Sequence, residues 1–534
     1  MSGLFASSQV MEQVSAPATP GRRILAIALP SLAIDRIRRR ERSRSAAPDD
    51  RPLGVVSNVR GLLRLTAVDA RAVAAGCQAG AALGEARGIC PELRVEPADE
   101  HGDASALDAI ADWCDRYTPL VGLDGPAGLA LDVTGCAHFF GGEKALADDL
   151  VTRLAAQGFC ARVAVAGTMG TARALAWFTP GGVAALGEEA ARVGELPIGA
   201  LRIPDDARLG LTRAGLRTVA AVAARGRTEL AARFGASLVT RLDETLGTID
   251  PPISPRRPAP SRMVERRFAE PLAQTEAALA VLRALGLSLG RRLELSGEGI
   301  RRAEAAFFRT DGGVARIAIG LGAPTRDPDL LLRLFRERID ALADPLDPGF
   351  GFDMIRLSAP EAEPLLPEER DFRADEREIA ARDLDELVDR LSAREGRGRV
   401  LRAFARDAHR PEAEAELSSA QGSRAVVWAP LRPEGEPPRR PLRLFARPEA
   451  VDVLAEVPDG PPIRFVWRRA VHRVARAEGP ERVALEWWRV DEAPLTRDYF
   501  RVEDEAGARF WLFRDGLFVR EVRHPRWYLH GLFA

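Results

Sequence analysis

Short apolar runs alternate with amphipathic stretches between residues 22 and 178, a pattern typical of an α/β domain. The first run, Ile24 to Leu29, is apolar at every position and ends at Pro30. A run of this length that is apolar on both faces predicts a buried strand, with a helix beginning after the proline. Further strands are predicted at Leu53–Ser57, Leu62–Thr66, Leu129–Val133 and Ala161–Ala166. Helices are predicted at Ala67–Ala75, Leu83–Ile89, Ser105–Tyr117, Glu143–Gln157 and Gly170–Trp177.

Residues 193–250 read as short leucine-rich helices, and the run Leu209–Val219 (LGLTRAGLRTV) is typical of a helix–hairpin–helix. Gly215 allows the turn, and the helix beginning near Thr218 leaves backbone N–H groups that can face a phosphate. Arg213 and Arg217 flank this turn, so these four residues are predicted to contact DNA. A helical bundle with a solvated arginine surface is the alternative.

The next two segments predict a linker and a second sheet. Residues 251–263 begin with the proline-rich run PPISPRRPAP, typical of an extended linker. Residues 264–360 predict the order βαββαβ, a ferredoxin-like sandwich. Four arginines on its strands could face a phosphate backbone, and solvated strand arginines are the alternative. They are Arg301, Arg302, Arg309 and Arg316.

The last third of the chain predicts an acidic helix and a β-rich domain. Residues 361–395, within a predicted linker and helix at 361–396, hold thirteen acids against six arginines. Leu384, Leu387, Val388 and Leu391 form one apolar stripe there, which predicts a packed domain edge or, alternatively, a helix that binds a partner. Residues 397–534 contain six of the eight tryptophans, and their short strands predict a separate β domain for protein contacts.

Composition limits the chemistry. The 534 residues predict about three or four domains, and the net charge of −1 leaves only local patches to attract nucleic acid. Lys144 is the single lysine and has no phosphate-binding loop before it, which excludes a P-loop ATPase. The five cysteines form no CxxC pair, so reduced thiols and no metal or other cofactor are expected. Residues 1–21 predict a flexible tail, and without a signal peptide or membrane span we expect a cytoplasmic protein.

The order of these units resembles the palm, fingers, thumb and little finger of the Y-family (UmuC- and DinB-like) translesion DNA polymerases. Asp69-Ala-Arg71, with Gly76, Gly80, Ala86 and Cys90-Pro91 behind it, is similar to the family's fingers stretch. Tyr117 to Asp132 resembles the region that ends in the second catalytic motif, and Val165-Ala-Gly resembles the third palm segment. The resemblance covers residues 23 to about 360. It implies palm and fingers over 22–192 and a multidomain α/β and α+β fold.

The resemblance also shows where the family's catalytic carboxylates would lie. The first motif places them at Ile27 and Leu29, and the second at Ala127 and Gly128, none of which can bind a metal. Of the two residues that would contact the nucleotide triphosphate, the tyrosine falls on Val68 and the arginine on Arg71, which leaves Arg71 as a remnant. Asp35, Asp124 and Asp132 are the acids from which an alternative site could be rebuilt.

This pattern, together with the additional C-terminal domain, is similar to the ImuB family, the catalytically inactive Y-family homologues of bacterial mutagenesis. The resemblance implies an adaptor in SOS-induced translesion synthesis, located at the nucleoid. Its implied partners are DNA bound without sequence preference, an ImuA-like protein and an error-prone C-family DNA polymerase. The sliding clamp is a further candidate, although Glu368–Phe372 is only a degenerate clamp-binding peptide. The alternatives are an active Y-family polymerase with relocated metal ligands and a stand-alone DNA-binding repair factor.

Overall fold

The computed structural model describes residues 21–43, 49–258, 260–365, 376–423, 440–441, 443–456, 460–486 and 495–533. The chain divides into two compact units, Met1–Ala374 and Asp375–Ala534. Across the described residues, no helix combines the length and the apolar character needed to cross a membrane.

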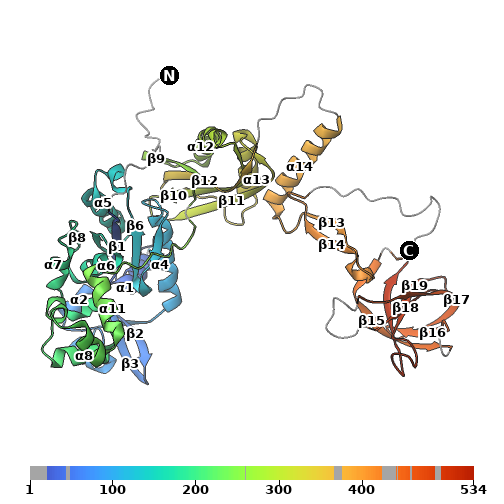
Figure 1. Ribbon diagram of the computed structural model, residues 1–534, viewed down its shortest axis with the longest axis horizontal. Helices are drawn as coiled ribbons and strands as arrows, with labels where there is room; N and C mark the ends of the chain where they lie inside the picture. Colours follow the sequence, from blue (N-terminus) through green and yellow to red (C-terminus); the bar gives the residue numbers. More distant parts are fainter. Residues whose placement is uncertain are drawn as a thin grey trace. The chain divides into compact units, whose positions relative to one another are not determined.

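The palm of the first unit is a five-stranded sheet (Figure 1) in the order β5-β6-β1-β7-β8. Its strands are β1 (Ile24–Ala28), β5 (Val121–Leu123), β6 (Gly128–Asp132), β7 (Arg162–Ala166) and β8 (Gly182–Val183). The strand predicted at the start of the chain is confirmed as β1, central in the sheet and antiparallel to both neighbours. All five of its residues are buried. Helix α1 (Leu32–Ser43) follows shortly after Pro30.

Both faces of the palm sheet are covered, which explains why β1 is apolar throughout. Leu25 and Ile27 pack in one cluster with helices α4 (Glu100–Cys114) and α5 (Glu143–Ala156). Ile24, Ala26 and Ala28 pack in a second cluster, with α6 (Met169–Phe178) and the helices of the thumb. Helix α4 begins earlier than predicted because the Asp99 side chain caps it, accepting a hydrogen bond from the Gly102 N–H at 2.9 Å.

The fingers form a three-stranded sheet in the order β3-β2-β4 with two short helices. These elements are β2 (Leu53–Val59), β3 (Leu62–Val68), α2 (Ala70–Ala74), α3 (Leu83–Ile89) and β4 (Arg94–Pro97). The helix predicted over Ala67–Ala75 begins only at Ala70, because Ala67 and Val68 still pair with β2. Strand β4 was not predicted: its sequence RVEP is short and polar, and its parallel pairing with β2 stabilises it.

The thumb consists of short helices, α7 (Glu189–Gly194), α8 (Asp205–Arg213), α9 (Val219–Ala223), α10 (Arg227–Phe234) and α11 (Ala236–Leu246). The predicted hairpin is the connection from α8 to α9. Gly215 has a φ of 77° there, a conformation that favours glycine. The Thr218 side chain caps α9 by accepting a hydrogen bond from the Ala221 N–H.

The proline-rich segment after the thumb lies against the palm. The Arg256 N–H donates to the carbonyl of Val121 in edge strand β5 at 2.9 Å. The Arg256 side chain pairs with Asp108 and Asp112 of α4, both at 2.8 Å. These contacts fix the segment along the sheet edge rather than leaving it a free linker.

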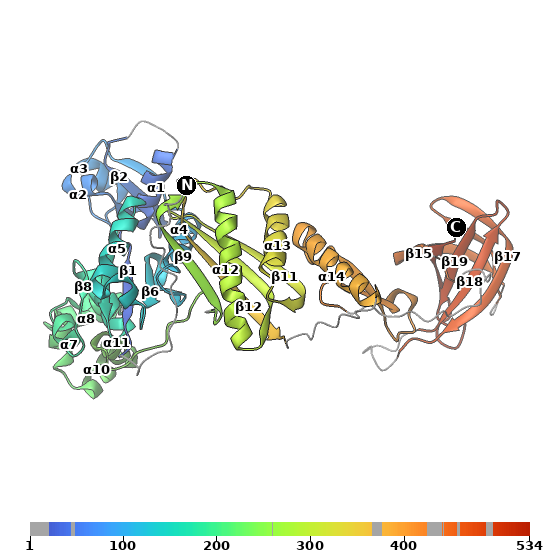
Figure 2. The same ribbon diagram turned by 90° about the horizontal axis from the view of Figure 1, so that it is seen from above.

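The little finger is a two-layer sandwich of four antiparallel strands in the order β11-β10-β12-β9. It contains β9 (Met263–Leu272), α12 (Thr275–Leu295), β10 (Glu298–Arg309), β11 (Val314–Thr325), α13 (Pro328–Asp340) and β12 (Phe352–Pro364). Figure 2 shows α12 and α13 side by side over one face of the sheet. Each βαβ pair is split by a strand of the other pair, so the predicted βαββαβ sandwich is confirmed.

The second unit contains α14 (Glu376–Glu395), a hairpin and a closed barrel. The hairpin is β13 (Leu401–Ala405) with β14 (Ala415–Ser419). The barrel strands are β15 (Arg443–Ala455), β16 (Pro462–Trp467), β17 (Ala470–Val483), β18 (Arg497–Asp504), β19 (Arg509–Asp515) and β20 (Arg526–Leu532). The predicted β-rich domain is confirmed, with Trp511 in its core. Trp428, Trp487 and Trp488 lie outside the described residues, as does Glu368–Phe372.

The prediction that the apolar stripe of α14 forms a packed domain edge is wrong. Leu384, Leu387 and Leu391 are 47%, 49% and 42% exposed, and only Val388 of the stripe is buried. The buried face lies one position further along the helix, where the Gln421 Nε2 donates to the Asp389 carboxylate at 2.9 Å. A buried polar contact of this kind, which apolar periodicity does not report, sets the rotation of the helix.

Candidate functional site

Two of the positions where the resemblance would place the family's carboxylates lie in the palm core. Ile27 is 1% exposed and Leu29 is 0% exposed, and both pack in the cluster with α4 and α5. The Leu29 N–H donates to the Ala127 carbonyl at 2.9 Å, and Ala127 packs against the same cluster. The structure therefore brings Ile27, Leu29 and Ala127 together as hydrocarbon, which offers a cation no ligand.

The fourth position, Gly128, has no room for a side chain. A Cβ atom there would lie 2.6 Å from the Asp124 carbonyl oxygen and 3.4 Å from that of Ile27. The first distance is shorter than real Cβ contacts, and its partner is backbone rather than a flexible side chain. The carboxylate that the family's motif would place at this position does not fit unless the turn from Asp124 to Ala127 moves.

The three acids considered for a rebuilt site are occupied elsewhere. Asp124 accepts a hydrogen bond from Arg202 of the thumb at 2.7 Å and lies 3.8 Å from Arg173 of α6. Asp35 accepts one from the Cys160 N–H at 2.8 Å, and burial raises the pKa of its carboxyl. Asp132 accepts from Arg22 at 3.2 Å.

These acids also lie apart. Asp132 pairs with Ile24 at one end of β1, whereas Gly128 pairs with Ala28 at the other. The two positions are four residues apart along the strand, roughly 13 Å at the usual rise. Among the described residues, no group of three or more His, Cys, Asp or Glu side chains could hold a metal ion.

Arg71, predicted as a remnant of the nucleotide site, is engaged by an acid of its own domain. Its guanidinium lies 2.6 Å from the Asp50 carboxylate and donates to the Asp50 carbonyl at 2.5 Å. It borders a cavity of about 350 Å³ whose charged lining mixes both signs. The lining residues are Arg38, Glu41, Arg42, Asp49, Asp50, Asp69, Ala70 and Arg71. In this structure a carboxylate holds the guanidinium that the family resemblance assigns to the triphosphate.

The predicted hairpin residues of the thumb lie on the surface. Arg213 and Arg217 are exposed on either side of Gly215, and Thr218 caps the helix behind it. Within the described part of the chain, neither guanidinium makes an ion pair or a hydrogen bond. Arg225, in the turn after α9, is likewise exposed; it lies outside the hairpin motif, so the sequence did not single it out.

The predicted strand arginines of the little finger are each paired with a carboxylate. Arg301 lies 3.1 Å from Glu363, and Arg302 lies 3.4 Å from Glu361. Arg309 pairs with Asp311 at 2.5 Å, and Arg316 pairs with Asp115 of the palm and with Glu304. The structure therefore does not present these four side chains as free phosphate ligands.

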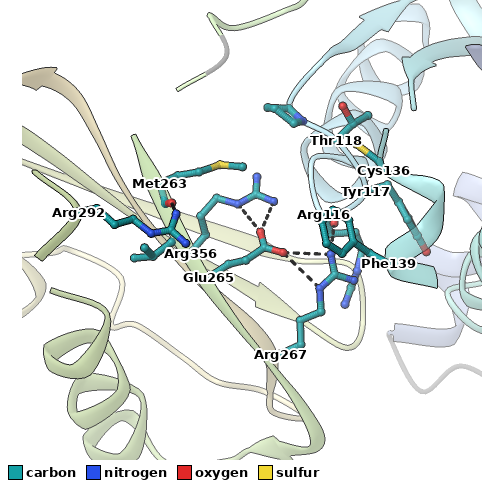
Figure 3. Close-up of a pocket in the computed structure, with 12 residues that line it drawn as sticks. Arg116, Tyr117, Thr118, Cys136, Phe139, Met263, Glu265, Arg267, Arg292 and Arg356 are labelled. Carbon is teal, nitrogen blue, oxygen red and sulfur yellow. Dashed lines mark hydrogen bonds and ion pairs between the residues drawn. The ribbon is translucent and has the colours of Figure 1, made fainter. Parts of the chain in front are cut away.

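A small cavity of about 50 Å³ lies between the palm and the little finger (Figure 3). Beside it, Glu265 accepts hydrogen bonds from Arg356 at 2.7 and 2.9 Å and from Arg267 at 3.2 and 3.3 Å. Burial alone would raise the pKa of Glu265, but the two arginines outweigh it and hold this pKa below its usual range. Sequence reasoning missed this cluster because Glu265 and Arg356 lie 91 positions apart and no motif connects them.

Comparison with known proteins supplies the family. Residues 39–176 match the IMS: impB/mucB/samB family. Protein ImuB of Caulobacter vibrioides, from strain NA1000 / CB15N and from strain ATCC 19089 / CIP 103742 / CB 15, is 42% identical over 465 residues. The match covers 85% of this chain and 99% of each relative.

Two solved structures that match this chain are each 14% identical to it in sequence. The crystal structure of DinB from Sulfolobus solfataricus matches with a TM-score of 0.37, and the match covers 64% of this chain and 99% of that chain. The insertion ternary complex of Dbh DNA polymerase matches with a TM-score of 0.39, over 65% of this chain and 100% of that one. Because the identity to the Caulobacter proteins extends through nearly their whole length, this chain belongs to the ImuB family.

Proposed function

We propose that this protein is a non-catalytic, Y-family polymerase-like adaptor of translesion synthesis after DNA damage. It binds DNA and recruits an error-prone polymerase that performs the synthesis. Membership of the ImuB family and the impB/mucB/samB match support the role in translesion synthesis. The adaptor role rests on the site and surfaces described above.

One observation carries the proposal that synthesis is lost: Ile27 and Leu29 are core residues, and Gly128 touches the backbone of Asp124. Nucleotidyl transfer by the two-metal scheme needs carboxylates that hold two cations about 3.5–4 Å apart. Hydrocarbon supplies no ligands, and burying an unpaired cation there would be very costly. The acids nearby are bound to arginines or to backbone N–H groups.

DNA binding is proposed through the exposed hairpin of the thumb. Arg213 and Arg217 are exposed and carry charge that no described carboxylate neutralises, whereas the N–H groups of the turn between them donate to carbonyls of α8. We propose that these two guanidinium groups contact phosphates, which carry no sequence information, so the binding has no sequence preference.

The second unit is proposed to bind the protein partners, an ImuA-like protein and an error-prone C-family polymerase, with the sliding clamp as a further candidate. Its barrel exposes apolar side chains on three neighbouring strands, which suits protein contacts. These are Leu454 of β15, Ile463 of β16 and Val471 of β17.

Primer extension by the purified full chain tests the loss of catalysis. With a primer–template, deoxynucleotides and either Mg²⁺ or Mn²⁺, we expect no nucleotide to be added. Asp124→Asn is the matched variant, because Asp124 is the acid nearest in sequence to Ala127 and Gly128. If the unmodified protein extended the primer and Asp124→Asn abolished this extension, the protein would instead be an active polymerase with relocated metal ligands.

Co-purification tests the adaptor role against a stand-alone repair factor. The full chain, mixed with a purified error-prone polymerase and ImuA-like protein of the same organism, is expected to form a complex. Val471→Arg should weaken this complex, and Leu295→Arg is the control, because Leu295 is exposed on the little finger. A chain that binds DNA but neither protein would be a stand-alone repair factor.

A further inference from the structure

We propose that the little finger is latched onto the palm by charged side chains, and that DNA phosphates displace the carboxylates of this latch. The latch is defined by Asp115, Arg116 and Arg153 of the palm with Arg316 and Asp353 of the little finger. The inference builds on the proposed DNA binding and adds an autoinhibitory contact to it.

Asp353, the second residue of β12, is the centre of the latch. It accepts hydrogen bonds from Arg116 at 2.7 Å and from Arg153 at 2.9 Å. The side chains of Arg116 and Asp353 are only 4% and 6% exposed, so their charges are removed from water in the docked arrangement. A little-finger acid is thus held by two palm arginines.

The reverse pairing lies nearby: the palm acid Asp115, next to Arg116, binds Arg316 of β11. Arg267 of β9 donates to the Arg116 carbonyl at 2.6 Å, and its guanidinium lies 4.7 Å from the centre of the Phe140 ring. Figure 3 shows Arg116 and Arg267 facing one another from the two domains. Each of the two domains therefore contributes both an acid and an arginine to the ion pairs between them.

A second contact point is the turn between β10 and β11. Arg39 of α1 donates to the Asp311 carbonyl at 2.9 Å. Gly312 has a φ of 89°, and a Cβ there would lie 2.1 Å from the Gln157 amide oxygen. The Gln157 side chain of the palm therefore lies directly against the turn, and the positive φ of Gly312 favours glycine there.

The docked face is the face of the sheet that the helices leave uncovered. Helices α12 and α13 pack on one face of the sheet. Ala306, which pairs directly with Arg316, shares a buried cluster with Phe308 and Met354. Arg316 extends from this face to Asp115 of the palm. While the domains are docked, neither Arg316 nor this face is available to a phosphate backbone.

The chemistry of the latch suits a contact that opens. Charged and polar interfaces between domains separate more readily than apolar ones, because each surface is stable in water. Three buried latch atoms, Arg116 Nη1, Arg316 Nε and Asp353 Oδ1, have no hydrogen-bond partner among the described residues. Such atoms penalise the docked state. Arginine binds phosphate with the same two-pronged geometry as carboxylate, so DNA can take over the released guanidinium groups.

Two substitutions test the latch in the full chain: Asp115→Asn, which removes the palm partner of Arg316, and Asp353→Asn, which removes the little-finger partner of Arg116 and Arg153. DNA affinity is measured by fluorescence anisotropy with a labelled primer–template. Each variant is expected to bind about fivefold tighter, the lower end of usual coupling between two sites. The control is Asp329→Asn, which removes the same charge from a pair with Arg283 within the little finger. An equal gain in the control, or no gain in either latch variant, would overturn the proposal.

Hydrogen–deuterium exchange separates this proposal from the proposed function. Without DNA, Asp353→Asn should speed amide exchange at the end of α4 and the start of β12, whereas Asp329→Asn should not. Adding primer–template to the unmodified protein should have the same effect on these two segments. Unchanged exchange in both experiments would refute the latch. Faster exchange in the variant without any measurable DNA binding would support the latch and refute the proposed DNA binding.

Discussion

At the scale of single residues, Gly128 is a position where close backbone contact leaves no room for a side chain. We expect Gly128→Ala to destabilise the first unit by roughly 1–3 kcal/mol, the usual cost of forcing atoms into a packed site. Chemical denaturation followed by tryptophan fluorescence would measure it. Gly84→Ala is the control: its Cβ meets nothing within 4 Å, and alanine favours helix α3. Equal stability of the two variants would show that the turn at Asp124 yields freely.

His530 gives the barrel a pH dependence. Burial lowers the pKa of His530 to about 4, below its ordinary value of 6.5. Between these values the unfolded chain takes up a proton that the folded barrel does not, so the stability present above pH 6.5 is lost as the pH falls towards 4. The urea midpoint of the second unit should therefore decrease between pH 6.5 and 5. His530→Gln should flatten this decrease, whereas the exposed His524→Gln should leave it unchanged.

At the scale of elements, the helix–hairpin–helix is the proposed DNA contact. Arg213→Gln together with Arg217→Gln should weaken DNA binding and reduce its salt dependence by about one unit of slope per lost phosphate contact. Anisotropy titrations at several salt concentrations would measure the slope. Arg283→Gln, which removes an exposed arginine of α12, should leave the slope unchanged. An unaltered slope in the double variant would mean that the hairpin does not touch DNA.

Helix α14 shows what periodicity does and does not report. Replacing Leu384 and Leu387 with Gln should change the urea midpoint little, because both side chains are exposed. Val388→Ala should cost about 1.5 kcal/mol through the loss of two buried carbon groups. A larger loss from the leucine pair would mean that the leucine stripe is a packed surface after all. The spacing of leucines predicted the helix correctly, but a polar contact between Asp389 and Gln421 decides its rotation.

At the scale of the whole molecule, the two units have separate hydrophobic cores. Leu150 belongs to the palm core and Phe465 to the barrel core. In calorimetry we expect two transitions, one for each unit. Leu150→Ala should lower the free energy of unfolding of the first unit, and Phe465→Ala that of the second, each by about 2–5 kcal/mol. A single transition that shifts with either substitution would show instead that the units unfold together.

Local pattern in the sequence was enough to determine several features of this protein. The buried strand at Ile24, the hairpin at Gly215, the βαββαβ order and the apolar residues at Ile27 and Leu29 all follow from side-chain type and spacing over a few residues. The sequence also indicated the family, through the order of its units and the motifs of the fingers and palm.

Only the tertiary structure decided which charges meet. Arg316 and Asp115 are 201 positions apart, and Asp353 and Arg116 are 237 apart. No periodicity connects such positions, because an ion pair depends on where the folded backbone places its ends. The sequence therefore predicted which arginines bind DNA. The folded structure pairs those of the little finger with carboxylates and gives Arg213 and Arg217 of the thumb no such partner among the described residues.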